Sequence, residues 1–477
     1  MKEMLSKEEI KSNLKILFTA IFIGFLVYNF IFYYMGLSYP ILIGALIIGF
    51  LVTNGIKNKN PMGFFLIAVS IILSLTYAIY TNPIFRFLNR IIIPLSLTSS
   101  FLLLTYKDIR FEFKVIYRSI IKKVFIESLY NIKIIRVLIK SLTKQINTKE
   151  DTINYRDILL GFLISIPLIF MLVLILGKAD KVFEYYIENL SSSINNEAFG
   201  KIFLRAFLSI LASIFIFGLY NSFSINNIKV EEDIRYSFKF NSLVVITILS
   251  IVTFIYISFT KIQISYLYGS KSLPDGFNYS EYARSGFFQL VFLVFVNVVS
   301  IILIKNNTKS KGKLQKKILL TLYSLITVLT FNMVFSALYK MRLYIVAFGF
   351  TRLRILVIVF TVFLGIILVL VLLFIFKDIN LFKPIIILGA VMYIVINFTN
   401  IDNFITRENI NIAKNSTEID NTYLTSLSFD SYMTMKNALK KGEISMEQYH
   451  NWVYNNKIEI NYWHEYNYFN SKGNSIK

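Results

Sequence analysis

Cysteine is absent from the 477-residue chain, and histidine occurs only as His450 and His464. The lack of cysteine excludes disulfides, thiolate catalysis and Cys-ligated zinc. Two histidines in a polar tail are more typical of exposed positions than of a metal site. The phosphate-binding loop, the nucleophile elbow and the H-E-x-x-H zinc helix are missing as well. We therefore expect no metal, no cofactor and no catalytic residues.

Charge is also scarce, because only 16% of the residues are charged while 56% are hydrophobic. Soluble domains seldom carry so little charge, so repeated apolar spans are expected. The predicted fold is an all-α polytopic membrane protein with about eleven transmembrane helices of roughly 20 residues, a cytoplasmic amphipathic helix and a small α-helical extracytoplasmic tail. The expected spans are 15–34, 39–54, 62–80, 87–105, 157–176, 202–220, 242–260, 285–304, 316–338, 353–376 and 382–399.

Acidic residues are the minority, with 28 Asp and Glu against 50 Lys and Arg and a formal net charge of +22. In a soluble protein this balance would suggest nucleic acid, but the basic and aromatic platform of a single-strand binder is not evident. In a membrane protein Lys and Arg mark cytoplasmic loops and contact anionic headgroups. We therefore expect no nucleic-acid partner. The expected partner is the lipid bilayer with anionic headgroups at its inner face, and an unknown membrane or envelope protein is a further candidate.

The distribution of basic residues predicts the topology. Lysines precede the first span, which we expect to be uncleaved, and the connectors 106–156 and 305–317 are densely basic. These features place the N-terminus in the cytoplasm, and an odd number of spans places the C-terminal tail outside. Residues 339–354 contradict the pattern, because they should lie outside yet contain four basic residues. Either the number of spans is wrong by one, or these cations have a role on that side: they snorkel at helix ends or neutralise acidic groups on the outer face.

The connector 106–156 contains a predicted amphipathic helix near 120–142. Its apolar residues recur at helical spacing, and Ser128 is the small polar interruption on that face. Basic residues lie nearby, which is typical of a helix on the cytoplasmic membrane surface. Docking to a protein partner is the alternative. The apolar face comprises Ile121, Val124, Phe125, Ile132, Ile135 and Ile139.

Composition divides the chain into four segments: membrane spans at 1–105, the basic loop at 106–156, a core membrane domain at 157–399 and a polar tail at 400–477. In the tail, Asp430 is predicted to cap a helix that stops at Gly442. Ser445 with Gln448 predicts a capping box at the start of a second helix. An aromatic strip follows, which is expected to rest on the membrane interface or on the outer loops; it comprises Tyr462, Trp463, Tyr466 and Phe469.

A polar and aromatic stretch, 274–290, joins two apolar segments. Pro274 and Gly276 predict a turn. Asn278 and Glu281 predict a capping box for a helix that continues as a membrane span. This helix would carry tyrosines, Glu281 and Arg284 to the edge of the bilayer.

From about residue 180 to the tail the chain resembles a family of bacterial multi-span membrane proteins known as domain of unknown function 4173, with the related 4153. The resemblance rests on the residues at 279–290, 179–183, 342–354 and 400–410, in that family's order along the chain. It implies a polytopic protein of the bacterial cytoplasmic membrane and supplies no activity.

All four stretches fall on or beside the predicted outer face, where they suggest a polar cluster of Asp180, Tyr279, Glu281, Tyr282, Arg284, Arg342, Tyr344, Arg352 and Arg407. The cluster is either a ligand site or a hydrogen-bonded clamp that holds the outer ends of the spans together. Within it, Glu281 is expected to pair with Arg284, Arg342 or Arg352. The favoured function is a non-enzymatic envelope sensor or scaffold. A transporter or flippase for an anionic or amphiphilic substrate is the alternative, and a membrane-embedded transferase is least favoured.

Overall fold

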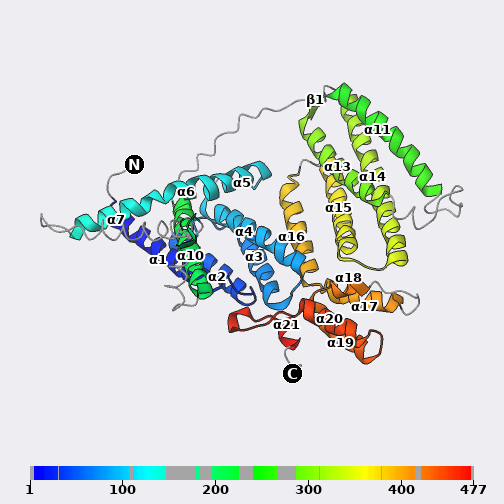
Figure 1. Cartoon of the computed structure of the whole chain (residues 1–477). Helices are drawn as coiled ribbons and strands as arrows, with labels where there is room; N and C mark the ends of the chain where they lie inside the picture. Colours follow the sequence, from blue (N-terminus) through cyan, green and yellow to red (C-terminus); the bar gives the residue numbers. More distant parts are fainter. Residues whose placement is uncertain are drawn as a thin grey trace. The chain divides into compact units, whose positions relative to one another are not determined.

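The computed structural model describes residues 5–30, 32–107, 109, 111–146, 176, 179–182, 196–224, 240–265, 286–310, 312–377, 379–413 and 421–473 (Figure 1). Contacts divide the chain into two compact units. Unit 1 consists of Met1–Tyr80, Ile84–Lys229 and Glu459–Lys477, and unit 2 of Thr81–Pro83 and Val230–Ile458. Unit 1 therefore includes the C-terminal residues of the chain. Unit 2 includes Thr81–Pro83, a three-residue connector from the N-terminal part of the chain.

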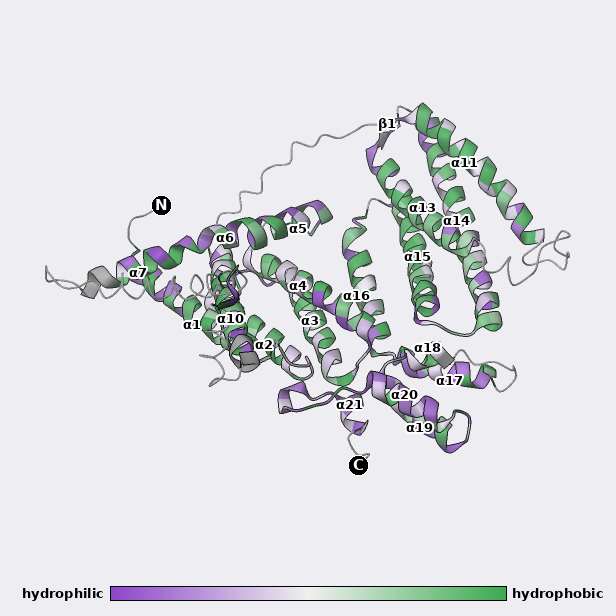
Figure 2. Cartoon of the chain, in the orientation of Figure 1, coloured by the Kyte–Doolittle hydropathy of each residue, from purple (hydrophilic) through white to green (hydrophobic). Residues whose placement is uncertain are grey.

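The described residues contain eight helices that are long and apolar enough to cross a membrane, or nine if the bent pair α16–α17 counts as one span. This finding confirms the all-α polytopic fold, and green, hydrophobic helices dominate Figure 2. Each expected span overlaps a described helix except 157–176, of which only residue 176 is described. The eight are α1 (Lys7–Phe30), α3 (Pro61–Ile79), α4 (Pro83–Thr105), α10 (Asn196–Ser224, from Lys201), α11 (Ser242–Gln263), α13 (Phe287–Asn307), α14 (Lys313–Phe348) and α15 (Arg352–Phe376).

In unit 1, α1 and α10 pack against each other in antiparallel directions. Gly24 allows the close approach, because a Cβ there would meet Ser213, and the Ser209 hydroxyl donates to the Gly24 carbonyl at 2.6 Å. The shorter apolar helix α2 (Ser38–Asn54) adds Phe50, which stacks on Phe101 of α4 with ring centroids 3.8 Å apart. A small residue and an aromatic stack thus form two of the close contacts between these helices.

The predicted amphipathic helix is present as α5 (Phe113–Ile120), a π-helical segment η1 (Ile121–Glu127), α6 (Ser128–Asn131) and α7 (Lys133–Ile146). It packs on the end of α10, where the Lys123 ammonium donates to the Ser222 carbonyl at 2.6 Å and to Glu127 at 2.5 Å. Ser128 is buried because its backbone lies against Gly218. The polar interruption in the sequence is therefore the point where this helix meets α10.

The C-terminal residues of unit 1 lie at the other end of α1. The aromatic strip rests on the loop that follows this helix, as one of the two predictions had it: the Tyr462 ring contacts the Tyr33 ring at 4.8 Å, and the Leu37 backbone N–H donates to the Tyr466 carbonyl. Short helical turns, η4 (Trp463–Glu465) and α21 (Tyr468–Lys472), complete the tail. Asn467 donates to the carbonyl oxygens of Tyr77 and Tyr80 and so ties the tail to the end of α3.

In unit 2, α11, α13, α14 and α15 surround an apolar core that includes Val294, Met333 and Leu368. Asn297 and Asn332 form side-chain hydrogen bonds between helices inside this unit. Asn297 accepts from the Tyr256 hydroxyl at 2.8 Å, and Asn332 donates to Gln263 at 3.1 Å. Two short strands, β1 (Phe240–Asn241) and β2 (Thr308–Lys309), pair in parallel before α11 and after α13.

Two boundaries of unit 2 differ from prediction. The expected connector 339–354 is helical as far as Phe348, because α14 runs for 36 residues. At 1.5 Å per residue this helix is about 54 Å long, well beyond a hydrocarbon core of about 30 Å. The helix predicted to start at Asn278 does not continue into the span through residue 286, and residues 278–285 themselves lie outside the described residues. Gly286 adopts a left-handed φ of 84°, so α13 begins at Phe287.

A polar helical cap ends unit 2. Helix α16 (Phe382–Phe398) bends by 58° into α17 (Ile401–Ala413), and α18 (Asn421–Thr425), the turn η3 (Phe429–Ser431), α19 (Tyr432–Lys440) and α20 (Met446–Asn456) follow. We call α17–α20 the cap. The capping box of Ser445 and Gln448 is confirmed at the start of α20. The predicted cap at Asp430 is wrong: Ser431 precedes α19, and the Asp430 carboxylate binds elsewhere.

A buried acid centre as candidate functional site

The turn between α14 and α15 positions Arg352, the basic residue of the site. Gly349 ends α14 with a left-handed φ of 74°, and Thr351 caps α15 by accepting from the Arg354 backbone N–H. The side-chain amide of Asn409 in α17 forms two hydrogen bonds with the backbone of this turn. Its oxygen accepts from the Phe350 N–H at 2.7 Å, and its nitrogen donates to the Phe350 carbonyl at 2.9 Å. The cap therefore holds the turn through backbone groups, and Arg352 follows in a fixed position.

Asp402, in the first turn of α17, receives the Arg352 guanidinium in a bidentate pair. Arg352 Nε lies 2.8 Å from Oδ1, and Nη2 lies 2.6 Å from Oδ2. The Asp402 side chain is fully buried, and that of Arg352 is 15% exposed. Asn82 Nδ2 donates to Oδ1 and the Ser428 backbone N–H donates to Oδ2, at 3.1 and 3.0 Å. Each oxygen thus accepts two hydrogen bonds, and the carboxylate is fully satisfied.

Asp430 is the second buried carboxylate. It accepts from the Thr81 backbone N–H and hydroxyl at 2.6 and 2.7 Å, and from the Asn82 N–H at 3.0 Å. Its own carbonyl oxygen accepts from Asn400 Nδ2 at 2.8 Å. Asp430 therefore holds the connector Thr81–Pro83 against the cap. We call Arg352, Asp402 and Asp430, with Thr81, Asn82 and Ser428, the acid centre.

The charges of the acid centre do not balance when both carboxylates are ionised, because the centre holds two carboxylates and one guanidinium. Burial raises the pKa of Asp430 to about 6; its hydrogen bonds with Thr81 oppose that shift, and the nearby Asp402 adds to it. Burial also raises the pKa of Tyr423, whose hydroxyl accepts from the Arg352 backbone N–H at 2.7 Å. Asp430 is thus the group of this centre whose proton affinity is shifted towards neutral pH.

The structure brings one predicted site residue, Arg352, into the acid centre. Tyr344 belongs to α14, where the Arg354 guanidinium lies 4.1 Å from the centre of its ring. Arg342 is exposed, and Arg407 pairs with its neighbour Glu408 at 2.9 Å. Asp180 belongs to unit 1, where its carboxylate accepts from the Val182 N–H. Tyr279, Glu281, Tyr282 and Arg284 lie outside the described residues, so the pairing of Glu281 stays a prediction.

Sequence reasoning missed Asp402 and the true partners of Asp430. Asp402 carries a weak local signal, since it is an acidic residue in the first turn of a polar helix that directly follows a span. Asp430 resembles a helix cap in sequence, but its partner Thr81 is 349 residues away. Among the residues that the structure describes, no group of three or more His, Asp or Glu side chains could hold a metal ion.

The spans of both units and the polar cap define an α-helical polytopic membrane protein. A family profile described as "Domain of unknown function (DUF4153)" matches residues 67–438, and the chain belongs to this family. The resemblance to 4153 is thereby confirmed, and membership of 4173 itself stays a prediction. No curated protein and no solved structure matches the chain. All residues of the acid centre, from Thr81 to Asp430, fall inside the matched range.

Proposed function

We propose that the protein is a non-enzymatic sensor or scaffold of the bacterial envelope, in which the acid centre clamps the cap to the membrane helices of unit 2. The observation that carries this proposal is the position of Asp402. Its carboxylate joins the start of α15 through Arg352, the cap through the Ser428 N–H, and the connector through Asn82. A change in any one of these three parts would alter the partners of the same carboxylate.

The hydrogen bonding of the centre favours a clamp over catalysis. A general base needs an oxygen that can reach a substrate proton, whereas both oxygens of Asp402 are engaged inside the protein. Removal of one member of a buried ion pair typically costs about 3–5 kcal/mol, because a charge is left buried without its partner. A centre of this kind is suited to hold one arrangement of the cap until a competing interaction displaces it.

We further propose that the N-terminus lies in the cytoplasm and that the C-terminal tail lies outside. Two observations support this orientation. The two most basic connectors, 106–156 and 305–317, fall on one side of the predicted spans. Within unit 1, Leu5 donates to Ser141 of α7 at the start of α1, whereas the tail residue Tyr462 contacts Tyr33 beyond its end. The two termini thus belong to opposite ends of the same membrane helices.

A photocrosslinking experiment tests the scaffold. Tyr454 of the cap is 88% exposed, so a photoreactive amino acid at this position should capture the same discrete neighbour in cells on each trial. Asp402→Asn should reduce that adduct, while Glu408→Gln, which changes an exposed pair, should leave it intact. No discrete adduct in either background, or equal yields from both variants, would argue against a cap that works as a clamped platform.

Reconstitution of the purified protein into lipid vesicles distinguishes a transporter or flippase from a sensor or scaffold. Purified chain in proteoliposomes should show no time-dependent movement of a fluorescent anionic lipid between leaflets above that of protein-free vesicles. Movement that depends on the exposed Arg342, tested with Arg342→Gln, would favour the transporter or flippase in place of the sensor or scaffold.

A further inference from the structure

The segment α5–α7 presents three different strips along its length. One strip packs on unit 1 and includes Ile116, Lys123, Ser128 and Leu138, which are buried. A second strip is apolar or aromatic and exposed. It contains Phe113, Tyr117, Phe125, Ile126, Leu129 and Tyr130, with Phe125 60% exposed. A third strip is basic and exposed, and it contains Lys114, Arg118, Lys122, Lys133, Arg136 and Lys140.

The set of exposed residues on this segment differs from the set that the sequence predicted. The predicted apolar face divides, because Ile132, Ile135 and Ile139 are half-buried while Phe125 is exposed. The π-helical segment η1 accounts for part of this change, since a wider turn shifts the side chains that follow it relative to those that precede it. We call the exposed Phe113–Tyr130 residues of the second strip the aromatic strip of α5–α6.

The segment is fixed where two membrane helices end. Lys123 donates to the Ser222 carbonyl in the last turn of α10, so its charge also faces the negative end of that helix dipole. Further along, Ser141 of α7 accepts from the Leu5 N–H just before α1 begins. Because α1 and α10 are spans, the segment lies at the level where these helices leave the hydrocarbon.

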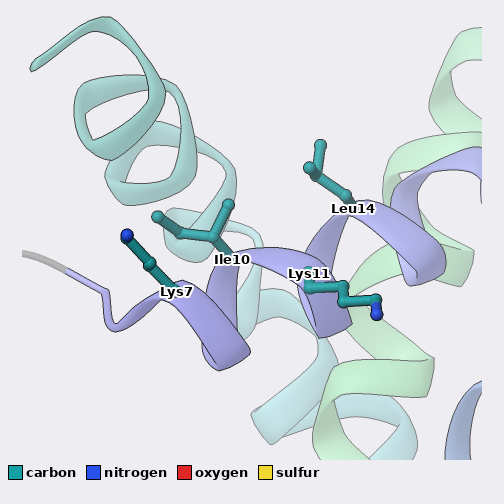
Figure 3. A pocket seen from close by; sticks show the side chains of 4 residues that line it. All are labelled: Lys7, Ile10, Lys11 and Leu14. Atoms are coloured by element: carbon teal, nitrogen blue, oxygen red, sulfur yellow. The ribbon is translucent and has the colours of Figure 1, made fainter. Parts of the chain in front are cut away.

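A second basic feature lies beside α7, on the first turns of α1. Lys7, Ile10, Lys11 and Leu14 line a hollow of about 510 Å³ (Figure 3). The spacing puts two lysines and two aliphatic residues on one face of the helix, and the two ammonium groups extend in different directions from it (Figure 3). This combination suits an anionic headgroup with the start of an acyl chain.

We propose that the aromatic strip of α5–α6, the basic strip of α5–α7 and the hollow on α1 together form a binding surface for anionic phospholipids of the membrane in which unit 1 lies. Between residues 111 and 146 eight residues are basic and two are acidic, and one of the acidic residues, Glu127, is paired with Lys123. Exposed aromatic side chains next to a basic strip match the boundary between acyl chains and charged headgroups. Charge complementarity and the attachment to α1 and α10 favour this lipid layer over a protein partner.

The first test measures lipid preference with the full-length solubilised chain. Titration with short-chain phosphatidylglycerol should show tighter binding than titration with short-chain phosphatidylcholine, and salt should weaken the difference. Lys133→Gln with Arg136→Gln should lower the affinity for phosphatidylglycerol by roughly fivefold per removed charge. The matched control is Lys440→Gln with Lys441→Gln, which removes the same charge from exposed positions on the cap and should leave the affinity unchanged. Equal affinity for both lipids, or equal loss in both variants, would overturn the proposal.

The second test locates the aromatic strip of α5–α6 relative to the lipid bilayer. The chain contains no cysteine, so single spin labels can be placed by Phe125→Cys and Arg136→Cys without further changes. In nanodiscs of phosphatidylglycerol and phosphatidylcholine, the label at 125 should collide more with oxygen than with a water-soluble nickel complex, and the label at 136 should show the reverse. Accessibility of position 125 to the nickel complex would overturn the proposal. Shielding of position 125 from both reagents would also overturn it and would indicate contact with a second copy of the chain.

Discussion

A single carboxylate, that of Asp402, binds three parts of unit 2 that are far apart in sequence. Its partners are Arg352 at the start of α15, Asn82 in the connector and the Ser428 N–H in the cap. Burial makes each of these hydrogen bonds costly to lose, since the polar group left behind has no access to water. Substitution of Asp402 should therefore disturb the arrangement of all three parts of unit 2.

Asp402→Asn should lower the thermal midpoint of the detergent-solubilised protein strongly, with a loss of about 3–5 kcal/mol, because it removes the carboxylate that is bonded directly to the largely buried Arg352 guanidinium. Glu408→Gln is the control. Its partner Arg407 is 61% exposed, and exposed pairs contribute about 0–1 kcal/mol. The double variant Asp402→Asn with Arg352→Gln should cost less than the sum of the single variants. Strict additivity would contradict a direct coupling.

Asp430 should make unit 2 sensitive to pH between about 4 and 6. Its pKa is raised from the ordinary value of 3.8 to about 6 in the folded state, so the folded state holds the proton more tightly than the unfolded state. This contribution to stability is complete below the unfolded pKa and is lost as pH rises through the folded pKa, with a total of about 3 kcal/mol. Thermal midpoints measured from pH 7.5 to 4.5 should therefore rise for the wild type relative to Asp430→Asn. Parallel pH profiles for the two proteins would refute this assignment.

Among the elements, the turn between α14 and α15 depends most on one residue. Gly349 has a left-handed φ of 74°, and a Cβ at this position would lie 2.9 Å from Asn409 Oδ1. The turn thus needs glycine both for its backbone conformation and for the approach of α17. The two requirements have different origins, because the first is local and the second depends on the cap.

Gly349→Ala should destabilise the protein by about 1–3 kcal/mol from backbone strain alone, because its φ of 74° and ψ of −173° define a conformation that is essentially restricted to glycine, with an additional loss because Asn409 must move away from Phe350. Gly442→Ala separates the two contributions. Gly442 also has a left-handed φ, of 71°, but no heavy atom lies within 4 Å of a Cβ placed there. A smaller loss in thermal midpoint for Gly442→Ala than for Gly349→Ala is expected. Equal losses would mean that Asn409 adjusts without cost.

At the scale of the whole molecule, the N-terminal and C-terminal residues both belong to unit 1. Residues from Glu459 onward return to unit 1, although the residues before them form the cap of unit 2. In unit 1 the basic segment α5–α7 and the C-terminal tail contact opposite ends of α1. A membrane that contains α1 would therefore separate them.

Fusions at Lys477 test this sidedness in cells. An alkaline phosphatase fusion should be active, because that enzyme folds outside the cytoplasm, and a fluorescent protein fusion at the same residue should stay dark. A fusion after Ile146 of α7 should give the opposite pair of results. Fluorescence from the fusion at Lys477 without phosphatase activity would mean that the number of spans is even and that the proposed orientation of the tail is wrong.

The sequence by itself determined the membrane helices, the polar tail and several local features. The apolar length of α15 and the capping box of Ser445 and Gln448 depend on residues close together in the chain, so composition and spacing suffice to predict them. The tertiary structure decided which polar groups meet. Asp430 has the local pattern of a helix cap but binds Thr81, and Arg352 pairs with Asp402. Such partners are selected by the packing of distant helices, because a buried carboxylate takes the donors that the fold brings to it.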